Sequence, residues 1–273
     1  MWENAARPKV MGIVNVTPDS FSDGGRHDQA AAAIAHGLTL IADGADLLDI
    51  GGESTRPGAA AVSADEELAR VLPVIAGLRA RTDTPLSIDT MKPAVARAAL
   101  AAGATVWNDV AALTAPDALA TAAELGCDVV LMHMKGEPRT MQDAPRYDDV
   151  VGEVETFLLA RAEAAVAAGV QAARIWLDPG IGFGKTVAHN LALLAALPRL
   201  VALGYPILLG ASRKRFIASL DPLGQDAGAR LGGSLAAAVA GAGAGVAAVR
   251  VHDVRETAQA LIVQAAIATA RDQ

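Results

Sequence analysis

Residues 85–109 read PLSIDTMKPAVARAALAAGATVWND, and this stretch contains the pattern that decides the fold. A short apolar run at residues 85–89 is followed by an Ala-rich segment at 92–102 and then by a second short run at 105–109. Short runs rich in Val, Ile and Leu are typical of buried strands, whereas the longer Ala-rich segment has the length and period of a helix. A strand, a helix and a second strand in this order predict a parallel β/α unit.

The same alternation extends over the whole chain. Strands are predicted at residues 10–16, 47–51, 85–89, 105–109, 128–132, 175–178, 206–210 and 246–251, and helices at 30–43, 64–81, 92–102, 117–125, 149–168, 187–203, 228–243 and 255–271. This number of units in a chain of this length predicts a single (β/α)8 TIM barrel, one domain over residues 1–273. A doubly wound open sheet is the alternative, but it usually has a Gly-rich first turn, and here residues 17–20 read TPDS.

The composition excludes several classes of protein. The chain has 273 residues, of which 52% are hydrophobic and 3% aromatic, and its formal net charge is -7. The apolar fraction is too high for a disordered chain, and the acidic balance argues against a nucleic-acid-binding surface. A single cysteine, Cys127, excludes an internal disulfide framework, and we recognise neither a signal peptide nor a membrane-spanning stretch. We therefore expect a soluble, cytoplasmic protein without nucleic-acid or membrane partners.

Every predicted strand is followed by a side chain that can hydrogen-bond or carry charge. In chain order these are Asn15; Glu53, Thr55 and Arg56; Asp89; Asn108 and Asp109; His133; Asp178; Ser212, Arg213 and Lys214; and Arg250 and His252. A polar strand end is common without any function, so one position alone carries little weight. In a barrel, however, the carboxyl ends of all strands meet at the face where active sites lie. A carboxylate such as Asp89 or Asp178, next to an apolar run, also needs a partner that a ligand can supply.

Eight segments of the chain resemble those of the dihydropteroate synthase family and occur in the same order. The members of this family are pterin-binding barrel enzymes of bacterial folate biosynthesis, and sulfonamides inhibit them. The two most specific segments are residues 11–25, MGIVNVTPDSFSDGG, and 49–58, DIGGESTRPG; the others are residues 87–90, 108–110, 131–136, 178–185, 210–217 and 250–254. The resemblance implies a transferase that joins 4-aminobenzoate to (7,8-dihydropterin-6-yl)methyl diphosphate. The products are 7,8-dihydropteroate and pyrophosphate, and Mg²⁺ assists. Trp107 departs from the family pattern, where an aliphatic residue is more usual, and it faces either the pterin or the barrel wall.

The resemblance implies a pterin site with a carboxylate at its centre. Asp178 matches the group that accepts two donors from the pterin edge, and Asn108 matches the amide that meets the remaining ring nitrogens. Asp89 lies toward the other side of the ring, Lys214 reaches the pterin carbonyl and lies along the aminobenzoate, and Met132 completes the site. These five residues define the expected pterin pocket.

A second group of residues matches the site of the leaving diphosphate. Arg250, His252 and Arg56 are the expected cations, because negative charge develops on the leaving group in the transition state. Asn15 matches the protein ligand of Mg²⁺, and diphosphate oxygens and waters supply the remaining ligands. The residues expected to take part in the chemical step are Asp89, Lys214, Arg250 and His252. The aromatic amine is neutral at pH 7 and attacks through its lone pair, so no deprotonating base is needed.

The 4-aminobenzoate site and its closure involve two long loops. The residues that match the pocket are Thr55, Arg56, Pro57, Phe183 and Ser212. Loops 17–25 and 51–58 are longer than ordinary βα connections, although they also fit plain connectors. We expect the loops with Phe21, Ser22 and Arg56 to close over bound diphosphate and to exclude water. The pterin diphosphate, or pyrophosphate, should therefore bind before 4-aminobenzoate.

The last predicted helix points to self-association. Residues 257–271 carry apolar side chains around most of the helix, and Gln259 and Gln264 are the large polar residues in its middle. A helix without a polar face is buried on more than one side. A homodimer through the C-terminal helices is therefore expected, as the family resemblance also implies.

Several alternatives fit the same residues. Arg250 can form a surface ion pair with Asp253 or Glu256, Phe183 can be an ordinary core anchor, and Asn108 and Asp109 can serve turn chemistry. A methyltetrahydrofolate-binding barrel of a corrinoid methyltransferase would share the pterin contacts but would need neither diphosphate cations nor an aminobenzoate pocket. A paralogue that binds pterin or a partner without turnover is a third possibility, although all the expected catalytic positions are filled.

Overall fold

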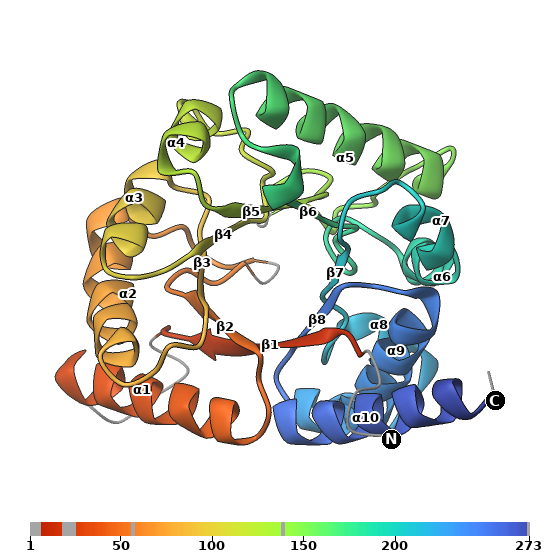
Figure 1. Ribbon diagram of the computed structural model, residues 1–273. Helices are drawn as coiled ribbons and strands as arrows, with labels where there is room; N and C mark the ends of the chain where they lie inside the picture. The colour runs from red at the N-terminus through yellow and green to blue at the C-terminus, as the bar shows by residue number, and fades with distance from the viewer. Residues whose placement is uncertain (1–6, 18–25, 56–57, 138–139, 272–273) are drawn as a thin grey trace.

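The computed structural model describes residues 7–17, 26–55, 58–137 and 140–271. One parallel sheet of eight strands has the order β6-β5-β4-β3-β2-β1-β8-β7. The sheet closes between β6 and β7, because the Leu177 N–H donates to the Pro206 carbonyl at 2.9 Å and Leu177 also pairs with Ile207. Helices surround the closed sheet (Figure 1), so the predicted single (β/α)8 TIM barrel is confirmed.

The strands and helices alternate along the chain. The strands are β1 (Lys9–Asn15), β2 (Leu47–Gly51), β3 (Leu86–Asp89), β4 (Val106–Asp109), β5 (Asp128–Met132), β6 (Ile175–Asp178), β7 (Leu208–Leu209) and β8 (Ala248–Val251). The α-helices are α1 (Arg26–Ala42), α2 (Ala64–Arg79), α3 (Pro93–Ala101), α4 (Ala118–Leu125), α5 (Val150–Ala167), α6 (Val187–Ala195), α7 (Leu197–Val201), α8 (Arg215–Leu220), α9 (Leu231–Ala244) and α10 (Val254–Arg271). Two short 3-10 helices, η2 (Ala172–Arg174) and η3 (Ala227–Arg230), precede β6 and α9.

The second half of the barrel departs from the sequence prediction. The helix predicted at residues 187–203 is two helices, α6 and α7, because Pro198 cannot donate to the preceding turn. The helix predicted at 228–243 is η3 followed by α9, and α8 forms where no helix was predicted. The strand predicted at 206–210 is paired over two residues only, Leu208 and Leu209. These changes all lie outside β1 to β5.

Two apolar clusters lie on opposite sides of the strands. The larger one fills the space between the sheet and the helices, and it includes Leu48 and Ile50 of β2. The smaller one fills the inside of the barrel and contains Met11, Leu47, Val106, Val130, Leu208 and Ala248, with Trp176 packed against it. Successive side chains of a strand point to opposite faces, so Leu47 and Asp49 share the inner face. We call the smaller cluster the barrel floor.

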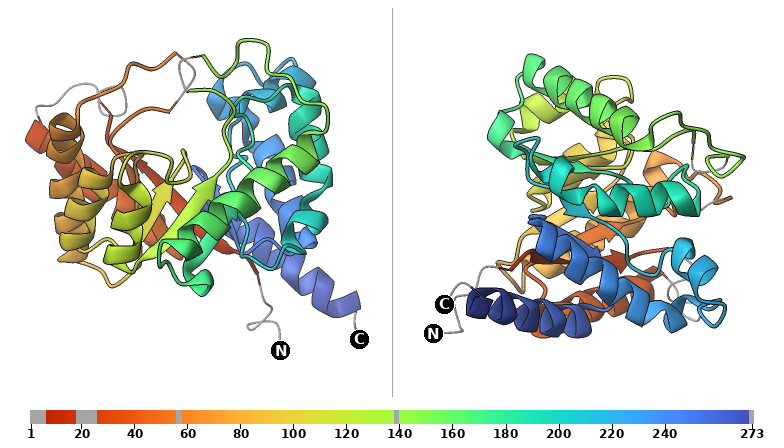
Figure 2. Two further views of the ribbon diagram at one scale, coloured as in Figure 1. Left: turned by 90° about the horizontal axis from the view of Figure 1, so that it is seen from above. Right: turned by 90° about the vertical axis from the view of Figure 1, so that its right-hand side faces the viewer.

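The polar residues predicted at the strand ends lie at one end of the barrel. In the left view of Figure 2, the loops that follow the strands are gathered at the top, and the start of β1 and the end of α10 lie at the bottom. This arrangement follows from the parallel sheet, because every strand runs in the same direction. In the part of the chain that the structure describes, no helix is both long and apolar enough to cross a bilayer.

Trp107 faces the barrel wall. Its side chain is fully buried in the outer cluster, between β4 and the helices, and its indole N–H donates to the Thr90 carbonyl at 2.8 Å. Asn108, the next residue, points to the opposite face of the same strand. The departure of Trp107 from the family pattern therefore leaves the inside of the barrel unchanged.

Candidate active site

Polar side chains replace apolar ones directly above the barrel floor. Two residues beyond their floor positions, β2, β4 and β8 present Asp49, Asn108 and Arg250 to the inside of the barrel. Strands β3 and β6 end in Asp89 and Asp178. Asp49 is fully buried, and Asn108 and Asp178 are 3% and 5% exposed. Buried polar groups in this number require partners, and Asp49, Asn108, Asp89 and Arg250 find them in one another.

Arg250 connects two carboxylates from neighbouring strands. Its Nε donates to Asp49 Oδ2 at 2.6 Å, and its Nη2 donates to Asp89 Oδ2 at 2.8 Å. Asn108 Nδ2 donates to the same Asp49 oxygen at 3.0 Å. The surface ion pair considered above for Arg250 is absent from the described residues, because Arg213 takes Asp253 as its partner instead. Arg250 therefore belongs to a layer of polar side chains inside the barrel, which we call the inner polar layer. It consists of Asp49, Asp89, Asn108, Asp178 and Arg250.

This environment keeps Asp89 close to protonation at neutral pH. Burial raises the pKa of Asp89 from its ordinary value to about 7, Arg250 opposes the shift, and Asp49, Glu67 and Asp109 add to it. Burial also raises the pKa of Asp178, although the Gly180 N–H bond opposes that shift. A buried carboxylate whose pKa lies near neutral pH is typical of functional sites.

The loop after β6 bends sharply so that Asp178 faces the inside of the barrel. Asp178 Oδ1 accepts from the Gly180 N–H at 2.6 Å. Gly180 has φ of +68°, and a Cβ there would lie 1.9 Å from the His133 carbonyl oxygen. Only glycine fits this position, because it is free of both the clash and the strain of positive φ.

Lys185 holds the same loop against the end of β5. It is 3% exposed, and its Nζ lies 2.9 Å from His133 Nδ1, 3.2 Å from the His133 carbonyl and 3.0 Å from the Phe183 carbonyl. Burial lowers the pKa of Lys185 to about 7 and the pKa of His133 to about 3. The sequence named His133 among the polar strand ends but gave Lys185 no role; the structure shows both as parts of one buried clamp.

Lys214 and Phe183 form one wall of the site. The Lys214 ammonium lies 4.0 Å from the centre of the Phe183 ring, which is a cation–π contact. Phe183 also packs with Val110, Met132 and Met141 in an apolar cluster separate from the main core. Burial lowers the pKa of Lys214 to about 8, Arg250 lowers it further, and Asp178 and Asp89 oppose the shift. A flat apolar surface therefore lies beside a cation.

Ser212 and His252 are joined across β7 and β8. The His252 N–H donates to Ser212 Oγ at 3.2 Å, and Ser212 Oγ lies 3.0 Å from His252 Nδ1. The Ser212 hydroxyl has one hydrogen and two lone pairs, so it pairs with Nδ1 in either tautomer of the neutral imidazole. Burial, with Arg250, lowers the pKa of His252 to about 3. In the free protein His252 is thus neutral, not the cation expected from the sequence.

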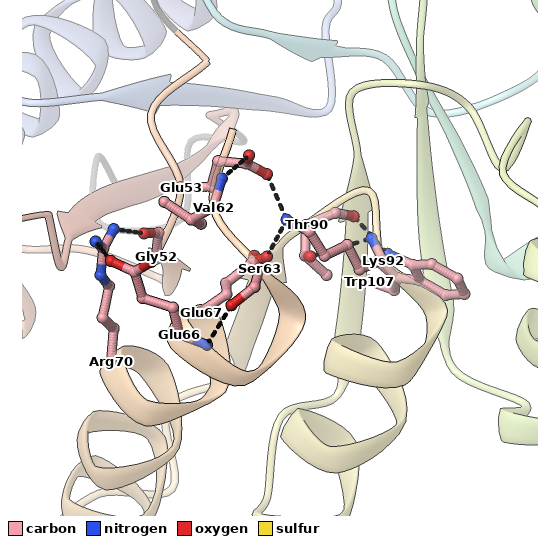
Figure 3. A network of polar contacts seen from close by, with 10 residues as sticks. All are labelled: Gly52, Glu53, Val62, Ser63, Glu66, Glu67, Arg70, Thr90, Lys92 and Trp107. Atoms are coloured by element: carbon pink, nitrogen blue, oxygen red, sulfur yellow. Dashed lines mark hydrogen bonds and ion pairs between the residues drawn. The ribbon is translucent and has the colours of Figure 1, made fainter. Parts of the chain in front are cut away.

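A buried ionic network supports the loop after β2 (Figure 3). Lys92 Nζ lies 2.7 Å from both Glu53 Oε2 and Glu67 Oε2, and Glu53 Oε1 accepts from the Val62 N–H at 3.0 Å. Lys92 N donates to Thr90 Oγ1 at 3.2 Å. The network joins the loop after β2, helix α2 and the start of α3. Only Glu53 was named from the sequence, because Lys92 and Glu67 belong to elements that the strand-end criterion did not cover.

The remaining predicted site residues differ in what can be said of them. Asn15 ends β1 in register with Gly51, and it is half-buried. Thr55, in the loop after β2, is half-buried too. The expectations for Phe21, Ser22, Arg56 and Pro57 lie outside the described residues.

Two further outcomes concern residues next to the predicted site. Asp109 accepts from the N–H groups of Ala111 and Leu113, both at 2.8 Å, so it serves turn chemistry. The Asn108 side chain instead donates to Asp49, and it makes no turn hydrogen bond with the described residues. Asp49 itself was missed, since it lies inside a strand and not at its end, but a carboxylate within the otherwise apolar run 47–50 was a visible signal.

The described polar side chains converge on one mouth. Lys214 follows β7 and acts electrostatically on Asp178 and His252, which follow the strands on either side of it, β6 and β8. The Lys214 ammonium thus lies over the flat Phe183 ring, within the electrostatic reach of Asp178, Asp89 and Arg250. A heterocycle with several ring donors and an anionic substituent fits this arrangement.

Comparison with known proteins agrees with that description. The sequence profile of a family described as pterin-binding enzymes matches residues 11–252. The dihydropteroate synthase of Escherichia coli is 47% identical over 267 residues, which are 98% of this chain and 94% of that protein. The barrel is thus that of a pterin-binding enzyme.

Solved structures give the same result. The structure of Xanthomonas albilineans dihydropteroate synthase with 4-aminobenzoic acid has a TM-score of 0.91 at 56% identity and covers 97% of this chain and 94% of that one. The same synthase with 7,8-dihydropteroate matches with a TM-score of 0.87 at 52% identity, over 98% of this chain and 95% of that one. The Yersinia pestis synthase in a sulfonamide complex has a TM-score of 0.92 at 47% identity, over 97% of this chain and 96% of that one. The chain therefore belongs to the dihydropteroate synthase family and is a transferase.

Proposed function

We propose that the protein joins 4-aminobenzoate to (7,8-dihydropterin-6-yl)methyl diphosphate in folate biosynthesis. The amine nitrogen forms a bond to the pterin methylene carbon, the carbon–oxygen bond to diphosphate breaks, and the electron pair leaves with pyrophosphate. The anilinium nitrogen then loses one proton to solvent, which gives 7,8-dihydropteroate. The observation that carries this proposal is the buried layer of Asp178, Asn108, Asp89 and Arg250 beside Lys214.

The pterin ring lies between Asp178 and the Phe183–Met132 surface in this proposal. The carboxylate of Asp178 accepts two pterin donors in a charge-assisted fork, and the carbonyl of Asn108 accepts a third. Lys214 donates to the pterin carbonyl, and its position over Phe183 supports that role. Asp89, on the other side of the ring, stabilises the positive charge that develops at the methylene carbon.

The diphosphate lies beside β8. Arg250 uses two of its five N–H donors on Asp49 and Asp89, so within the described part of the chain three are left for diphosphate oxygens. His252 donates from Nε2, and Arg56 is expected to supply a further cation. These donors meet more negative charge in the transition state than in the ground state, so they accelerate bond breaking. We infer a dissociative, cation-like substitution in which positioning is the main protein contribution.

The amine is positioned by Phe183, Ser212 and Lys214, together with Thr55, Arg56 and Pro57. The Glu53–Lys92–Glu67 network supports this assignment, since it anchors the loop in which Thr55 lies. Closure by Phe21 and Ser22 stays a prediction, and so does binding of pterin diphosphate or pyrophosphate before 4-aminobenzoate. Sulfonamides, which resemble 4-aminobenzoate, would compete for the same pocket.

Asn15 fits the protein side of a magnesium site. No cluster of three or more His, Cys, Asp or Glu residues suited to a metal occurs in the described part of the chain. Mg²⁺ needs no such cluster, because it usually keeps several waters and binds through one or two protein oxygens plus substrate phosphates. The half-buried Asn15 amide at the end of β1 can supply one oxygen. Bound Mg²⁺ would neutralise charge on the leaving diphosphate.

A homodimer through the C-terminal helices is also part of the proposal. Helix α10 exposes Ile262, Val263 and Ile267, each by more than half of its surface. Branched apolar side chains gathered on one helix are typical of an interface. Light scattering at micromolar concentration should give twice the monomer mass, and Ile267→Glu should give the monomer mass. A wild-type monomer would refute the dimer.

The cytoplasmic location also stays a prediction, which the buried free thiol of Cys127 suits.

Pyrophosphate release tests the proposed reaction. With both substrates and Mg²⁺, pyrophosphate and 7,8-dihydropteroate should form in a one-to-one ratio, and Asp178→Asn should abolish both. A protein that only binds pterin would release no pyrophosphate. A methyltransferase barrel would instead bind methyltetrahydrofolate and ignore 4-aminobenzoate.

A further inference from the structure

Asp49 is a buried carboxylate that the proposed reaction does not use directly. It lies in the middle of β2, it has no exposed surface, and the barrel floor lies beneath it. One of its oxygens, Oδ2, accepts both Arg250 Nε at 2.6 Å and Asn108 Nδ2 at 3.0 Å. The two partners come from β8 and β4, so Asp49 joins strands on both sides of its own.

The contact with Asn108 fixes which end of the amide faces a ligand. Because Nδ2 donates to Asp49, the carbonyl oxygen of Asn108 points elsewhere, and it has no hydrogen-bond donor among the described residues. A rotated amide would place its oxygen against a carboxylate oxygen, which is repulsive. The carboxylate of Asp49 thus selects an acceptor at the position where ring N–H groups of a pterin would lie.

The contact with Arg250 fixes the plane of the guanidinium. A guanidinium is planar and rigid, so bonds from Nε to Asp49 and from Nη2 to Asp89 determine where Nη1 points. Without Asp49, Arg250 would keep a single carboxylate partner and could rotate about it. The cation would remain in the site, but its donors would no longer be held in one orientation.

We propose that Asp49 is a positioning residue that orients the Asn108 amide and the Arg250 guanidinium for the pterin and its diphosphate. This inference rests on the proposed synthase reaction. It predicts that the loss of Asp49 weakens the binding of both the pterin and the pyrophosphate fragment, because Asn108 and Arg250 contact different parts of the substrate. A carboxylate that only filled space in the barrel would show no such pairing.

Ser87 provides a matched control. It is the neighbour of Asp49 in the β2–β3 register, it is also fully buried, and its Oγ, like Asp49 Oδ1, has no hydrogen-bond partner among the described residues. Ser87 touches neither Arg250 nor Asn108 through a hydrogen bond in that part of the chain. Ser87→Ala therefore removes a buried polar atom from the same layer without disturbing the oriented groups.

The test compares Asp49→Ala, Asp49→Asn and Ser87→Ala in the full-length protein. We would measure kcat and KM for both substrates, thermal unfolding, and calorimetric binding of two probes, 6-hydroxymethyl-7,8-dihydropterin and inorganic pyrophosphate. Asp49→Ala should lower kcat/KM for the pterin diphosphate by about 10²–10³-fold and weaken both probes, as loss of an oriented donor does. Asp49→Asn can keep an acceptor at the Oδ2 position, so it should restore part of the pterin affinity. Ser87→Ala should stay within about twofold of the wild type, because it removes no oriented donor.

A pH profile keeps the test decisive if Asp49→Ala does not fold. The charged groups that act on Asp89 are Arg250, Asp49, Glu67 and Asp109, and Asp89 in turn acts on Lys214. Removal of one negative neighbour stabilises the Asp89 carboxylate, so in Asp49→Asn the acid limb of kcat/KM should move to lower pH. An unmoved limb together with wild-type probe binding would overturn the inference.

The outcomes separate this inference from the proposed function. Suppose that the wild type is active. Asp49 variants that bind both probes normally, or a Ser87→Ala variant that loses as much activity as Asp49→Ala, would then contradict only the positioning role. A wild type that forms no 7,8-dihydropteroate contradicts the reaction itself, while weakened probe binding in folded Asp49 variants would still support the orientation of Asn108 and Arg250.

Discussion

Lys214 and Lys185 both act on Asp178, and burial lowers the pKa of each, to about 8 and about 7. Their surroundings differ. The Lys185 ammonium is enclosed by His133 Nδ1 and two backbone carbonyls. The Lys214 ammonium lies over the Phe183 ring and has no hydrogen-bond acceptor among the described residues.

The difference shows that a lowered pKa alone does not identify a catalytic lysine. Lys185 makes its hydrogen bonds within the protein, so it stabilises the loop that follows Asp178 and contains Phe183. In the proposed reaction, Lys214 donates its hydrogens to the substrate. The sequence predicted the role of Lys214 through the family resemblance, but both lysines follow a strand in a Gly-rich or polar loop, and their hydrogen bonds depend on the fold.

Among the variants that test this comparison, the largest effect is expected on the activity of Lys214→Ala. Loss of one well-placed donor should lower kcat/KM by about 10²–10³-fold. The midpoint of thermal unfolding should stay within a few degrees of the wild type, because the Nζ bonds no described group. Steady-state kinetics and calorimetry check both parts. A variant that unfolds at a much lower temperature, with residual activity in proportion to its folded fraction, would show that Lys214 stabilises the fold as Lys185 does.

Lys185→Met should have the opposite profile. The substitution keeps an apolar chain of similar length but leaves three buried acceptors without their donor. The free energy of unfolding should fall by about 2–3 kcal/mol, since each unsatisfied buried group costs ~1–3 kcal/mol and local relaxation recovers part of the loss. Urea unfolding measures this change. Unchanged stability with a loss of kcat/KM as large as that of Lys214→Ala would contradict the clamp.

The pH dependence of kcat/KM sharpens the comparison. Asp89 is anionic above a pKa of about 7, and Lys214 is cationic below a pKa of about 8. If both charged forms are needed, kcat/KM is highest between these values and falls on each side. In Lys214→Arg the alkaline limb should disappear, because a guanidinium stays charged. An alkaline limb that persists in this variant would assign the titration to another group.

The smallest expected effect belongs to Trp107. Trp107→Phe removes the hydrogen bond to the Thr90 carbonyl and some buried volume, so stability should fall by about 1–2 kcal/mol. The kcat/KM for both substrates should stay within about twofold of the wild type, because the ring faces away from the inside of the barrel. Unfolding and steady-state rates measure the two effects. A selective rise in the KM of the pterin substrate would mean that Trp107 shapes the pterin pocket.

The fold could be predicted because its signal is local. Each strand–helix unit shows its own change of period, so eight units could be counted without knowledge of their packing. The errors fall where local signals are weak. Pro198 lies in a segment with an otherwise continuous helical pattern, and the pairing of β7 over Leu208 and Leu209 depends on neighbours from β8.

The site could be predicted only in part. Asp178, Lys214 and Arg250 were named because they follow strands and match family segments; the structure brings them together, and their roles stay predictions. Asp49 contacts Arg250 across 201 positions of sequence, and no local pattern shows such a pair. The neutral state of His252 was also missed, since it follows from burial beside Arg250. Charge states and long-range partners thus required the structure.

A crystal structure with 6-hydroxymethyl-7,8-dihydropterin and pyrophosphate tests the central claim most directly. We expect the pterin edge on Asp178 and Asn108 and the pyrophosphate on Arg250 and His252. The contradictory result is a pterin bound elsewhere, for example in the cleft of about 750 Å³ that Tyr147 and other residues line beside α5, with the inner polar layer free of ligand.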